Sequence, residues 1–378
     1  MTITDVRARA VAVPLKRTAR MSTRVLSDRH YLLVEVTTDD GTKGLGYSYA
    51  GTSGGQVLAS SVELFEPVLR DADDTDILGL WDRLYQETLL TGRRGVVIRA
   101  LSAVDMALWD ANAKRAGVPL AVLLGGTTAR PIPAYASGGY YRPEDGPWET
   151  VVAAEIERNR AQGFRDHKIK VGGLTVEEDA KRVKAAIDAI GGTGRLGLDA
   201  NNAYRSVPEA ARAARAFERA AGDVGLWWFE EPLSPDDNAG HAALASQIET
   251  TVATGEIHQT RWEFRDLIER GGADILQPDA GVLGGVSEWL RVARTAETFG
   301  IQVAPHWHAN IHAHLAAAAP NCIAIEHFTL DKDIYNFEEL LTPASRLVVE
   351  DGAAVLGDRP GIGLEFDEDV VRTYELTR

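Results

Sequence analysis

DHKIKVGGLTVEEDAKRVKAAIDAIGGTGRLGLDAN, residues 166–201, contains a strand, a loop, a helix and a second strand. Thr175 and Glu178 have the spacing of a capping box, in which side chains satisfy free backbone N–H groups at a helix start. Gly191-Gly192 ends the helix, and the second strand follows at 195–201. A strand–helix–strand unit of this kind predicts two parallel strands joined by a helix.

The same alternation continues on both sides of this unit. Further capping-box spacings occur at Ser206 with Glu209 and at Thr260 with Glu263. Eight strands alternating with helices over about 200 residues predict a (β/α)₈-type barrel. The alternative, an open doubly wound sheet, lacks a Gly-rich phosphate turn after its first strand. The predicted strands are 134–137, 166–171, 195–201, 227–230, 252–256, 275–278, 303–306 and 322–327.

The N-terminal region has a different pattern. Strand-like alternation covers 7–13, 31–37 and 44–49, and helical periodicity runs from 56 to 124. Strands followed by segregated helices predict an α+β domain over residues 1–128. Pro131-Ile132-Pro133 marks the boundary to a second domain at 129–339. The tail, 340–378, returns to short strands and is predicted to pack on the first domain. Residues 15–28, between the first two strands, are predicted to form a polar loop.

Composition excludes several classes of partner. The 378 residues include 40 Lys and Arg against 55 Asp and Glu, a formal net charge of -15. This charge argues against a nucleic-acid or anionic-membrane partner, because no basic surface is available to displace counterions. No signal peptide or apolar run long enough to span a membrane is present. The single Cys322 excludes an internal disulfide and a thiolate metal site. A cytoplasmic location is expected.

Ionisable groups stand at the predicted strand ends. In a barrel of this type the residues that do chemistry lie at the C-terminal ends of the strands. Seven consecutive strands, from the second to the eighth, end this way, which is hard to explain as accident. In order, these residues are Lys168 and Lys170, Asp199 and Asn201, Glu230 and Glu231, Glu256, Asp279, His306, and Glu326.

Three of these acids predict a metal site. Asp199, Glu230 and Glu256 come from adjacent strands and should converge on one side of the barrel mouth. Three carboxylates without a counter-charge would repel one another and resist ionisation. Mg²⁺ prefers octahedral oxygen ligands and keeps positions open for water or substrate oxygens. Zn²⁺ is disfavoured because no His or Cys accompanies the acids.

Two further groups predict acid/base chemistry. Lys168 and Lys170 lie two apart on one strand and share a face, so repulsion is expected to lower the pKa of one of them. A neutral lysine amine can act as a general base. Asp279 and His306 end adjacent strands, where a carboxylate would fix the imidazole tautomer and favour its protonated form. By strand order this pair should lie across the mouth from Lys170.

Taken together, these motifs resemble the mandelate racemase branch of the enolase superfamily over essentially the whole chain. The stretch 100–110, ALSAVDMALWD, resembles the family's first-domain signature. Lys168-Ile169-Lys170, Asp199-Ala200-Asn201 and Glu230-Glu231-Pro232 follow in the family's order, as do Gly255-Glu256, Pro278-Asp279-Ala280, the His306 segment and the C-terminal GIGLEFD at 361–367.

The resemblance implies an α/β fold: a modified TIM barrel, (β/α)₇β, under an α+β capping domain built from the N-terminal region and the C-terminal tail. It implies Mg²⁺ ligation by the acid triad, with Glu231 supporting the ligands from behind. Lys170 would be the base on one substrate face, with Lys168 tuning it or contacting the substrate carboxylate, and the His306–Asp279 dyad would act on the other face. Glu326 would be protonated and would donate to the substrate carboxylate.

These roles imply removal of the proton next to a carboxylate, giving an enediolate. Loss of the neighbouring hydroxyl would then make the protein a lyase that dehydrates an acid sugar or small hydroxy-diacid to a 2-keto acid. Proton return on the opposite face would instead make it a racemase or epimerase of a 2-hydroxy acid. A non-catalytic carboxylate-binding barrel would have lost an acid/base residue, and none is lost. Asp279 stands where the muconate-cycloisomerising and dipeptide-epimerising groups carry a lysine.

The segments expected to cover the substrate are polar. In this family the loop 18–28 closes over the substrate, and here it carries Arg20 and Arg24, which suit a polyhydroxylated acid or diacid better than an aromatic one. A second, Gly/Ser-rich flap runs from Tyr49 to residue 55. The expected substrate contacts are Asn201, Arg24, Arg20, His308 and Tyr49. Exposed capping domains predict a homo-oligomer.

Overall fold

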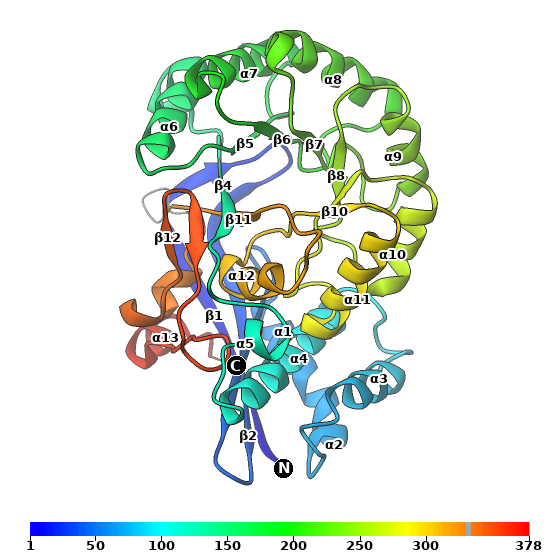
Figure 1. The fold of residues 1–378 in the computed structure, drawn as a ribbon, viewed down its shortest axis with the longest axis vertical. Coiled ribbons are helices and arrows are strands. Elements are labelled where there is room, and N and C mark those ends of the chain that lie inside the picture. Colours follow the sequence, from blue (N-terminus) through cyan, green and yellow to red (C-terminus); the bar gives the residue numbers. More distant parts are fainter. Residues whose placement is uncertain (330–333, 378) are drawn as a thin grey trace.

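The computed structural model describes residues 1–329 and 334–377. Its first part is a three-stranded antiparallel sheet, in the order β1-β2-β3, with helices packed against it (Figure 1). Gly46 lies against α4 so closely that an added Cβ would be 1.9 Å from the carbonyl oxygen of Ala103, so only glycine fits there. The elements are β1 (Ile3–Arg20), β2 (Val25–Thr38), β3 (Lys43–Tyr49), α1 (Gly55–Val62), α2 (Glu66–Leu69), α3 (Ile77–Glu87), α4 (Val96–Arg115) and α5 (Leu120–Leu123).

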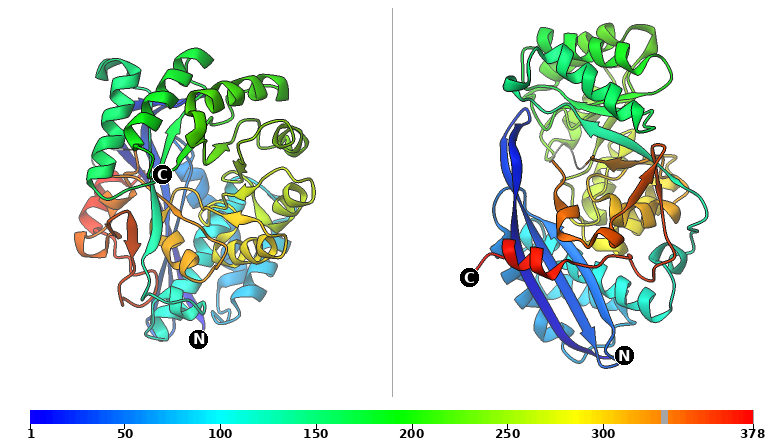
Figure 2. Two further views of the ribbon diagram at one scale, coloured as in Figure 1. Left: turned by 45° about the horizontal axis from the view of Figure 1, so that its top comes forward. Right: turned by 90° about the vertical axis from the view of Figure 1, so that its left-hand side faces the viewer.

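The predicted polar loop at 15–28 is wrong. β1 and β2 continue as a long two-stranded ribbon that pairs as far as Arg20 with Val25 and runs along the barrel (Figure 2). The physical reason is an alternation that the polar composition hides. Ala19, Met21 and Leu26 are buried in the same apolar cluster as residues of the barrel, while Arg20 and Val25 between them are exposed.

The second part is a closed parallel barrel. Hydrogen-bonded neighbours run from β10 to β4 in reverse chain order, and β11 pairs with β4. A parallel bridge between Val303 and Cys322 completes the ring, which excludes the open-sheet alternative. The elements are β4 (Ile132–Gly138), α6 (Trp148–Ala161), β5 (His167–Lys170), α7 (Val176–Ile190), β6 (Leu196–Asp199), α8 (Val207–Ala221), β7 (Trp228–Glu230), α9 (Asn238–Ala245), β8 (Val252–Thr254), α10 (Thr260–Glu269), β9 (Ile275–Leu276), α11 (Gly285–Thr298), β10 (Gln302–Val303), α12 (Ala309–Ala317) and β11 (Ile325–His327).

Within the described residues, β11 is followed by short 3₁₀ turns, η5 (Phe337–Leu340) and η6 (Pro343–Ser345), rather than by an outer helix. The architecture is therefore the expected α/β fold, a (β/α)₇β barrel with an N-terminal antiparallel cap.

One of the three predicted capping boxes is present. Thr175 and Glu178 cap α7 reciprocally. At α8, Ser206 makes no side-chain cap bond. At α10 the cap position is Gln259, whose N–H donates to Glu263 at 2.6 Å, because Thr260 already begins the helix with a left-handed φ of 62°. At both helices the glutamate accepts a hydrogen bond from a backbone N–H four residues earlier, whereas a capping box needs a spacing of three: Arg205 donates to Glu209, and Gln259 donates to Glu263.

The signature stretch 100–110 joins the cap to the barrel. It lies in α4, and its polar side chains reach the start of α11. Asp105 accepts from the N–H of Ser287 at 2.9 Å and from its hydroxyl at 2.5 Å. Trp109 donates to the same hydroxyl at 2.9 Å, and Ser102 accepts from the N–H of Gly284 at 2.8 Å. The motif is therefore an interdomain junction.

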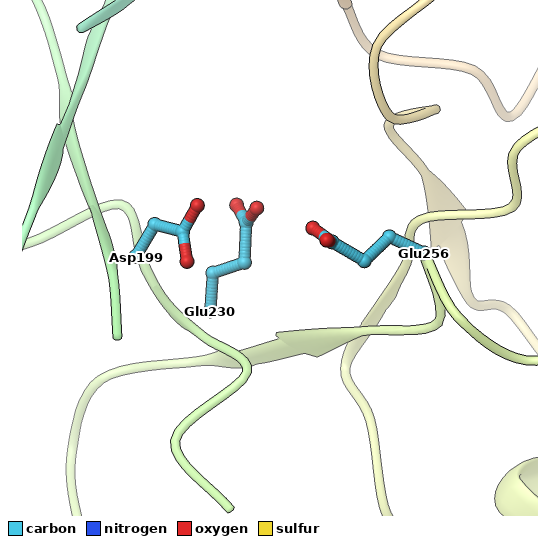
Figure 3. A group of neighbouring side chains, drawn as sticks. All are labelled: Asp199, Glu230 and Glu256. Atoms are coloured by element: carbon cyan, nitrogen blue, oxygen red, sulfur yellow. The ribbon is translucent and has the colours of Figure 1, made fainter. Parts of the chain in front are cut away.

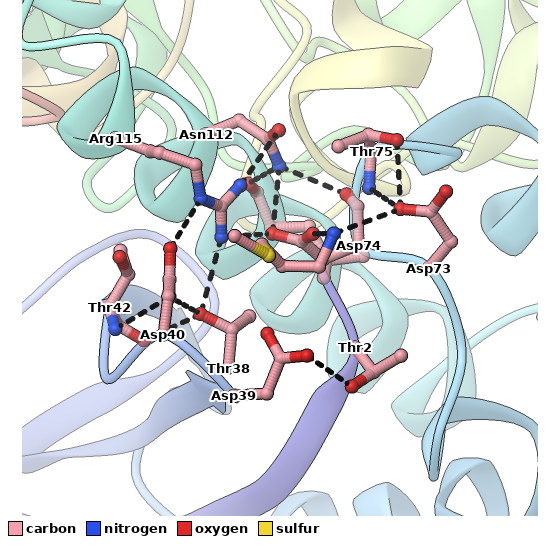
Figure 4. A network of polar contacts seen from close by, with 12 residues as sticks. Thr2, Thr38, Asp39, Asp40, Thr42, Asp73, Asp74, Thr75, Asn112 and Arg115 are labelled. Carbon is pink, nitrogen blue, oxygen red and sulfur yellow. Dashed lines mark hydrogen bonds and ion pairs between the residues drawn. The ribbon is translucent and has the colours of Figure 1, made fainter.

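A second polar network holds the cap together at its far end (Figure 4). Arg115, in the last turn of α4, donates to Asp74 at 2.7 Å and to Asp40 at 2.9 Å. Asp40 in turn accepts from Thr38 and Thr42 in the β2–β3 turn. One guanidinium thus links α4, the hairpin turn and the segment before α3.

The tail contacts both parts of the molecule. Its hairpin, β12 (Val348–Glu350) and β13 (Ala353–Val355), extends the barrel sheet beside β4. α13 (Glu368–Tyr374) packs on β1 (Figure 2). The predicted domain bounds, 1–128 with 340–378 and 129–339, stay a prediction, and they include residues 330–333 and 378, which lie outside the described residues. Among the described helices, none has the length and apolar character needed to cross a bilayer.

Candidate active site

Three buried polar residues lie side by side where β5, β6 and β7 end. Lys170 is in register with Asp199, and Asp199 is in register with Glu230. Glu256 follows β8 by two residues. Asp199 and Glu230 project from one side and Glu256 from the other, so that the three carboxylates face a common space (Figure 3). One ligand oxygen from each acid lies within 4.8 Å of the others.

The chemistry of this triad fits a divalent cation. Burial and the charge of Asp199 raise the pKa of Glu230 to about 8, so that the acids compete for protons. Oε2 of Glu256 is buried without a hydrogen-bond partner. Oε2 of Glu230 is positioned by donors from Trp228 at 2.9 Å and Gln277 at 2.6 Å. Oriented carboxylates with unused lone pairs are what Mg²⁺ coordinates, so these three residues could hold it.

Both lysines of the β5 motif point into the barrel and are paired with acids. Nζ of Lys168 lies 2.6 Å from Glu230 and 2.7 Å from Glu326, and Lys170 is paired with Asp199. The expected lowering of one lysine pKa is therefore wrong for this structure. Burial does lower the pKa of Lys170, but the charge of Asp199 outweighs burial and repulsion by Lys168, and the net shift is upward.

The predicted dyad forms on the neighbouring strands. Nδ1 of His306 lies 3.0 Å from Oδ2 of Asp279, whose other oxygen accepts from the N–H of Gly281 at 2.7 Å. Nε2 of His306 is 3.6 Å from Glu256. Burial alone would lower the pKa of His306, but Glu256 and the bond to Asp279 raise it to about 9. The imidazole is thus positioned as a proton donor.

Glu326 differs from its predicted state. Burial favours its neutral form, but Lys168 and then His306 lower its pKa to about 2. Its Oε2 also accepts from the backbone N–H of Trp307 at 2.7 Å, a bond that suits a carboxylate. The expectation of a protonated Glu326 is therefore wrong here. The physical reason is that the ammonium of Lys168 contacts Glu326 instead of pointing toward the substrate.

A cavity of about 270 Å³ joins these groups to the cap. Of the five predicted substrate contacts, Arg24, Tyr49 and Asn201 line it. Arg20 and His308 do not, and this corrects the prediction. The lining residues are Met21, Arg24, Leu26, Arg29, Tyr49, Ala50, Gly51, Thr52, Ser53, Tyr140, Lys170, Asn201, Glu231, Glu256, His306, Trp307, Glu326 and Phe328.

The two corrected residues have other surroundings. Arg20 is exposed on the ribbon, and its backbone pairs with Tyr141 of the barrel. His308 is fully buried among aromatic rings, and its Nδ1 lies 3.1 Å from the hydroxyl of Tyr335. Glu231, expected behind the metal ligands, instead lines the cavity itself, at a left-handed φ of 42°. Burial and then Glu256 raise its pKa.

Several lining residues escaped the sequence analysis. Leu26 lies in the predicted polar loop and Arg29 lies next to it, although the even spacing of the apolar residues 15, 19 and 21 could have indicated a strand. Tyr140, which lies under the ammonium of Lys170 at 5.1 Å from its ring centroid, carries no sequence signal. Trp307 and Phe328 follow His306 and Glu326 and could have been found from the strand ends.

Known proteins resemble the chain over nearly its full length. Two family models match: "Mandelate racemase / muconate lactonizing enzyme, N-terminal domain" over residues 3–125 and "Enolase C-terminal domain-like" over 151–370. Arabinonate dehydratase of Saccharolobus solfataricus is 33% identical over 90% of this chain and 89% of its own.

Solved structures agree with this match. A racemase from Streptomyces coelicolor A3(2) with bound magnesium superposes with a TM-score of 0.90 at 30% identity, covering 99% of this chain and 100% of its own. L-Talarate dehydratase from Polaromonas sp. JS666, complexed with Mg and L-glucarate, superposes with a TM-score of 0.88 at 33% identity, covering 100% and 98%.

Proposed function

The chain belongs to the mandelate racemase/muconate lactonizing enzyme family of the enolase superfamily, and from this premise we propose that it is a Mg²⁺-dependent lyase that dehydrates an acid sugar to a 2-keto acid. One observation carries the proposal. Lys170, a potential base, and His306, a potential acid, line one cavity beside the triad of Asp199, Glu230 and Glu256.

The triad would hold the cation, and Lys168 would supply further positive charge. A bound Mg²⁺ supplies fixed charge that stabilises the negative charge developing on the substrate carboxylate as its neighbouring proton leaves. Lys168, which is buried between Glu230 and Glu326, keeps these acids oriented. Glu326 in turn fixes the backbone that follows His306 through the N–H of Trp307.

The protein's own groups would move two protons. Nζ of Lys170, neutral once Asp199 shares its charge with a bound cation, would take the proton from the carbon next to the carboxylate and leave an enediolate. Nε2 of His306, protonated and held by Asp279, gives a proton to the hydroxyl on the next carbon as the C–O bond breaks. Water departs, and the resulting enol tautomerises to the 2-keto acid, so that atoms and charge balance.

The wall of the cavity supports a hydroxylated substrate. Thr52, Ser53, Tyr140 and Asn201, which carry hydroxyl or amide groups, line it together with two arginines. Names among the relatives also support dehydration: arabinonate dehydratase, L-talarate/galactarate dehydratase and L-rhamnonate dehydratase. The second candidate is racemisation or epimerisation of a 2-hydroxy acid, because acid/base groups from two sides of the barrel, Lys170 and His306, line the same cavity.

A substrate screen separates these functions. Stereoisomeric sugar mono- and diacids would be incubated with the protein and Mg²⁺, and 2-keto product would be measured, with α-deuterium incorporation from D₂O followed in parallel. Keto product with Mg²⁺, and none in EDTA, supports the lyase. Deuterium incorporation with inversion and no keto acid selects the racemase. No reaction of either kind across the panel would refute both.

The remaining expectations belong to the same proposal. The partner is a small carboxylic acid, in keeping with the L-glucarate named in a related structure. A cytoplasmic location and self-association into a homo-oligomer stay predictions. Light scattering coupled to gel filtration tests the second, and a monomeric mass at micromolar concentration would contradict it.

A further inference from the structure

Arg29 is a buried cation without a counter-ion. It lies on β2, is 5% exposed and lines the cavity. Its guanidinium carbon lies 4.6 Å from the ring centroid of Trp307. Its Nε is buried without a hydrogen-bond partner, and no carboxylate of the described residues lies at ion-pair distance from it. A ligand in the cavity is therefore the partner that Arg29 lacks.

Three other buried charged residues that line the cavity have partners of opposite charge. Lys170 is paired with Asp199, His306 with Asp279, and Glu326 with Lys168. Burying a guanidinium without a carboxylate partner costs free energy. Contact with an indole face offsets only part of that cost. Among the buried basic residues that line the cavity, Lys170 and His306 each have a carboxylate partner, and Arg29 has none among the described residues.

Trp307, against which Arg29 packs, is itself held in place. The backbone N–H of Trp307 donates to Glu326 at 2.7 Å, and its ring stacks on Tyr49 at a centroid distance of 5.9 Å. Phe328 packs against the indole of Trp307 edge to face, at a centroid distance of 4.8 Å. A guanidinium packed on an indole ring can still donate the N–H groups at its edge, and a carboxylate can accept two of them in parallel.

We propose that Arg29 binds a second carboxylate at the far end of the substrate, so that the preferred substrate is a sugar diacid and not the matching monoacid. This inference rests on the proposed function, in which the first carboxylate is held at the acid triad. The two binding groups come from different parts of the fold: the triad from the barrel and Arg29 from the cap. A short diacid would bridge them across a cavity of about 270 Å³.

The test compares substrates that differ at one carbon. Sugar diacids of five and six carbons, and the monoacids of the same stereochemistry, would be assayed with Mg²⁺ for kcat and KM. The variants are Arg29→Met, which keeps the stem and removes the charge, and Arg29→Lys, which keeps the charge and loses the fork. Arg7→Met, on the solvent side of the same sheet, is the matched control. Thermal melts establish that each variant is folded.

We expect the wild type to prefer the diacid by roughly 100-fold in kcat/KM. Arg29→Met should lower kcat/KM for the diacid by a similar factor, chiefly through KM, and should change the monoacid by less than about threefold. Arg29→Lys should recover part of the loss, and Arg7→Met should match the wild type.

Two results would overturn the inference while leaving the lyase intact: a wild-type preference for monoacids, or an equal loss on both substrate classes in Arg29→Met. If the wild type dehydrates neither class, the proposed function fails first, and the inference fails with it. If the thermal melt shows that Arg29→Met is unfolded, Arg29→Lys is used in its place. This variant must then show a lower kcat/KM for the diacid and an unchanged one for the monoacid.

Discussion

Lys170 and Asp199 lie side by side in the register of β5 and β6, and the ammonium of one is paired with the carboxylate of the other. The residue proposed to abstract the proton is therefore in direct contact with a residue proposed to ligate the metal. Asp199 raises the pKa of Lys170 when no cation competes for its charge. Base strength and metal binding are coupled through this one carboxylate.

Replacing Lys170 should separate the two functions. Lys170→Ala removes the base but none of the three acids, so α-proton exchange should fall by roughly 10³-fold. Mg²⁺ affinity should be retained, because Asp199 loses a competing ammonium. Deuterium incorporation followed by NMR and calorimetric titration with Mg²⁺ measure the two effects. Exchange at the wild-type rate would show that another group is the base.

Replacing His306 should uncouple deprotonation from elimination. His306→Asn keeps a similar shape but cannot donate a proton to the departing hydroxyl, so keto-acid formation should fall by roughly 10²- to 10⁴-fold. Lys170 remains, so the substrate should still take up deuterium from the solvent without being consumed. Keto-acid formation at the normal rate would remove His306 from the mechanism.

Glu256 should be needed for the metal. Glu256→Gln removes one negative ligand and should weaken Mg²⁺ binding by at least roughly tenfold. Calorimetry measures the dissociation constant directly. Glu269→Gln, at an exposed position on α10, is the control for the loss of one negative charge. Equal affinities in the two variants would exclude Glu256 from the ligand set.

Asp105, at the junction of cap and barrel, should make stability depend on pH. Burial raises its pKa from 3.8 to about 7 in spite of hydrogen bonds from Ser287. The folded state then binds a proton that the unfolded state releases, so the free energy of unfolding should fall as pH rises from about 4 to 7, by about 1.4 kcal/mol per unit of pKa difference. Above pH 7 this contribution is absent.

Asp105→Asn tests this dependence, because the variant has no such proton. The difference in unfolding free energy between wild type and variant, measured in urea at pH 5, 6, 7 and 8, should shift in favour of the variant up to pH 7 and then level off. A difference independent of pH would show that Asp105 is ionised in the folded state.

Arg115 should stabilise the cap. Arg115→Met leaves the buried carboxylate of Asp74 with the chain's N-terminal amine as its remaining charged partner, at 3.3 Å (Figure 4). Loss of a partner from a buried ion pair costs about 3 kcal/mol. Arg83→Met removes an exposed pair to Asp76 and should change stability by less than about 0.5 kcal/mol. Urea unfolding of both variants checks the contrast.

The barrel and its charged mouth could be predicted from the sequence. The barrel follows from the regular alternation of strands and helices, and the mouth follows from the ionisable residues at the strand ends. Parallel strands that are buried on both faces have to place their ionisable residues at one end, so Asp199, Glu230 and Glu256 could be assigned before any coordinates. The Asp279–His306 pair followed by the same logic. Adjacent strands in the chain are adjacent in a barrel, which turns order along the sequence into neighbourhood in space.

The rest depended on contacts between segments far apart in the chain. The ribbon at 15–28 has a polar composition, so its few apolar residues give only a weak strand signal, and the packing of these residues on the barrel could not be predicted. The protonation states of Lys170 and Glu326 depend on which group of opposite charge lies next to each of them. Strand order does not predict these distances between side chains. Arg29 was missed for the first of these reasons, and His308 was misplaced because its ring turns into an aromatic cluster behind the cavity.

The hydrogen bonds between α4 and α11 have a consequence for how this enzyme can diversify. They fasten the cap's long helix to the barrel, whereas at the ribbon tip the hydroxyls of Ser22 and Thr23 donate to backbone carbonyls just after β6. Insertions or exchanges at that tip can therefore reshape what the enzyme accepts at little expense to the scaffold. The residues that carry out the chemistry lie in the barrel, and residues that can change substrate selectivity lie in the ribbon tip, so the two can change separately.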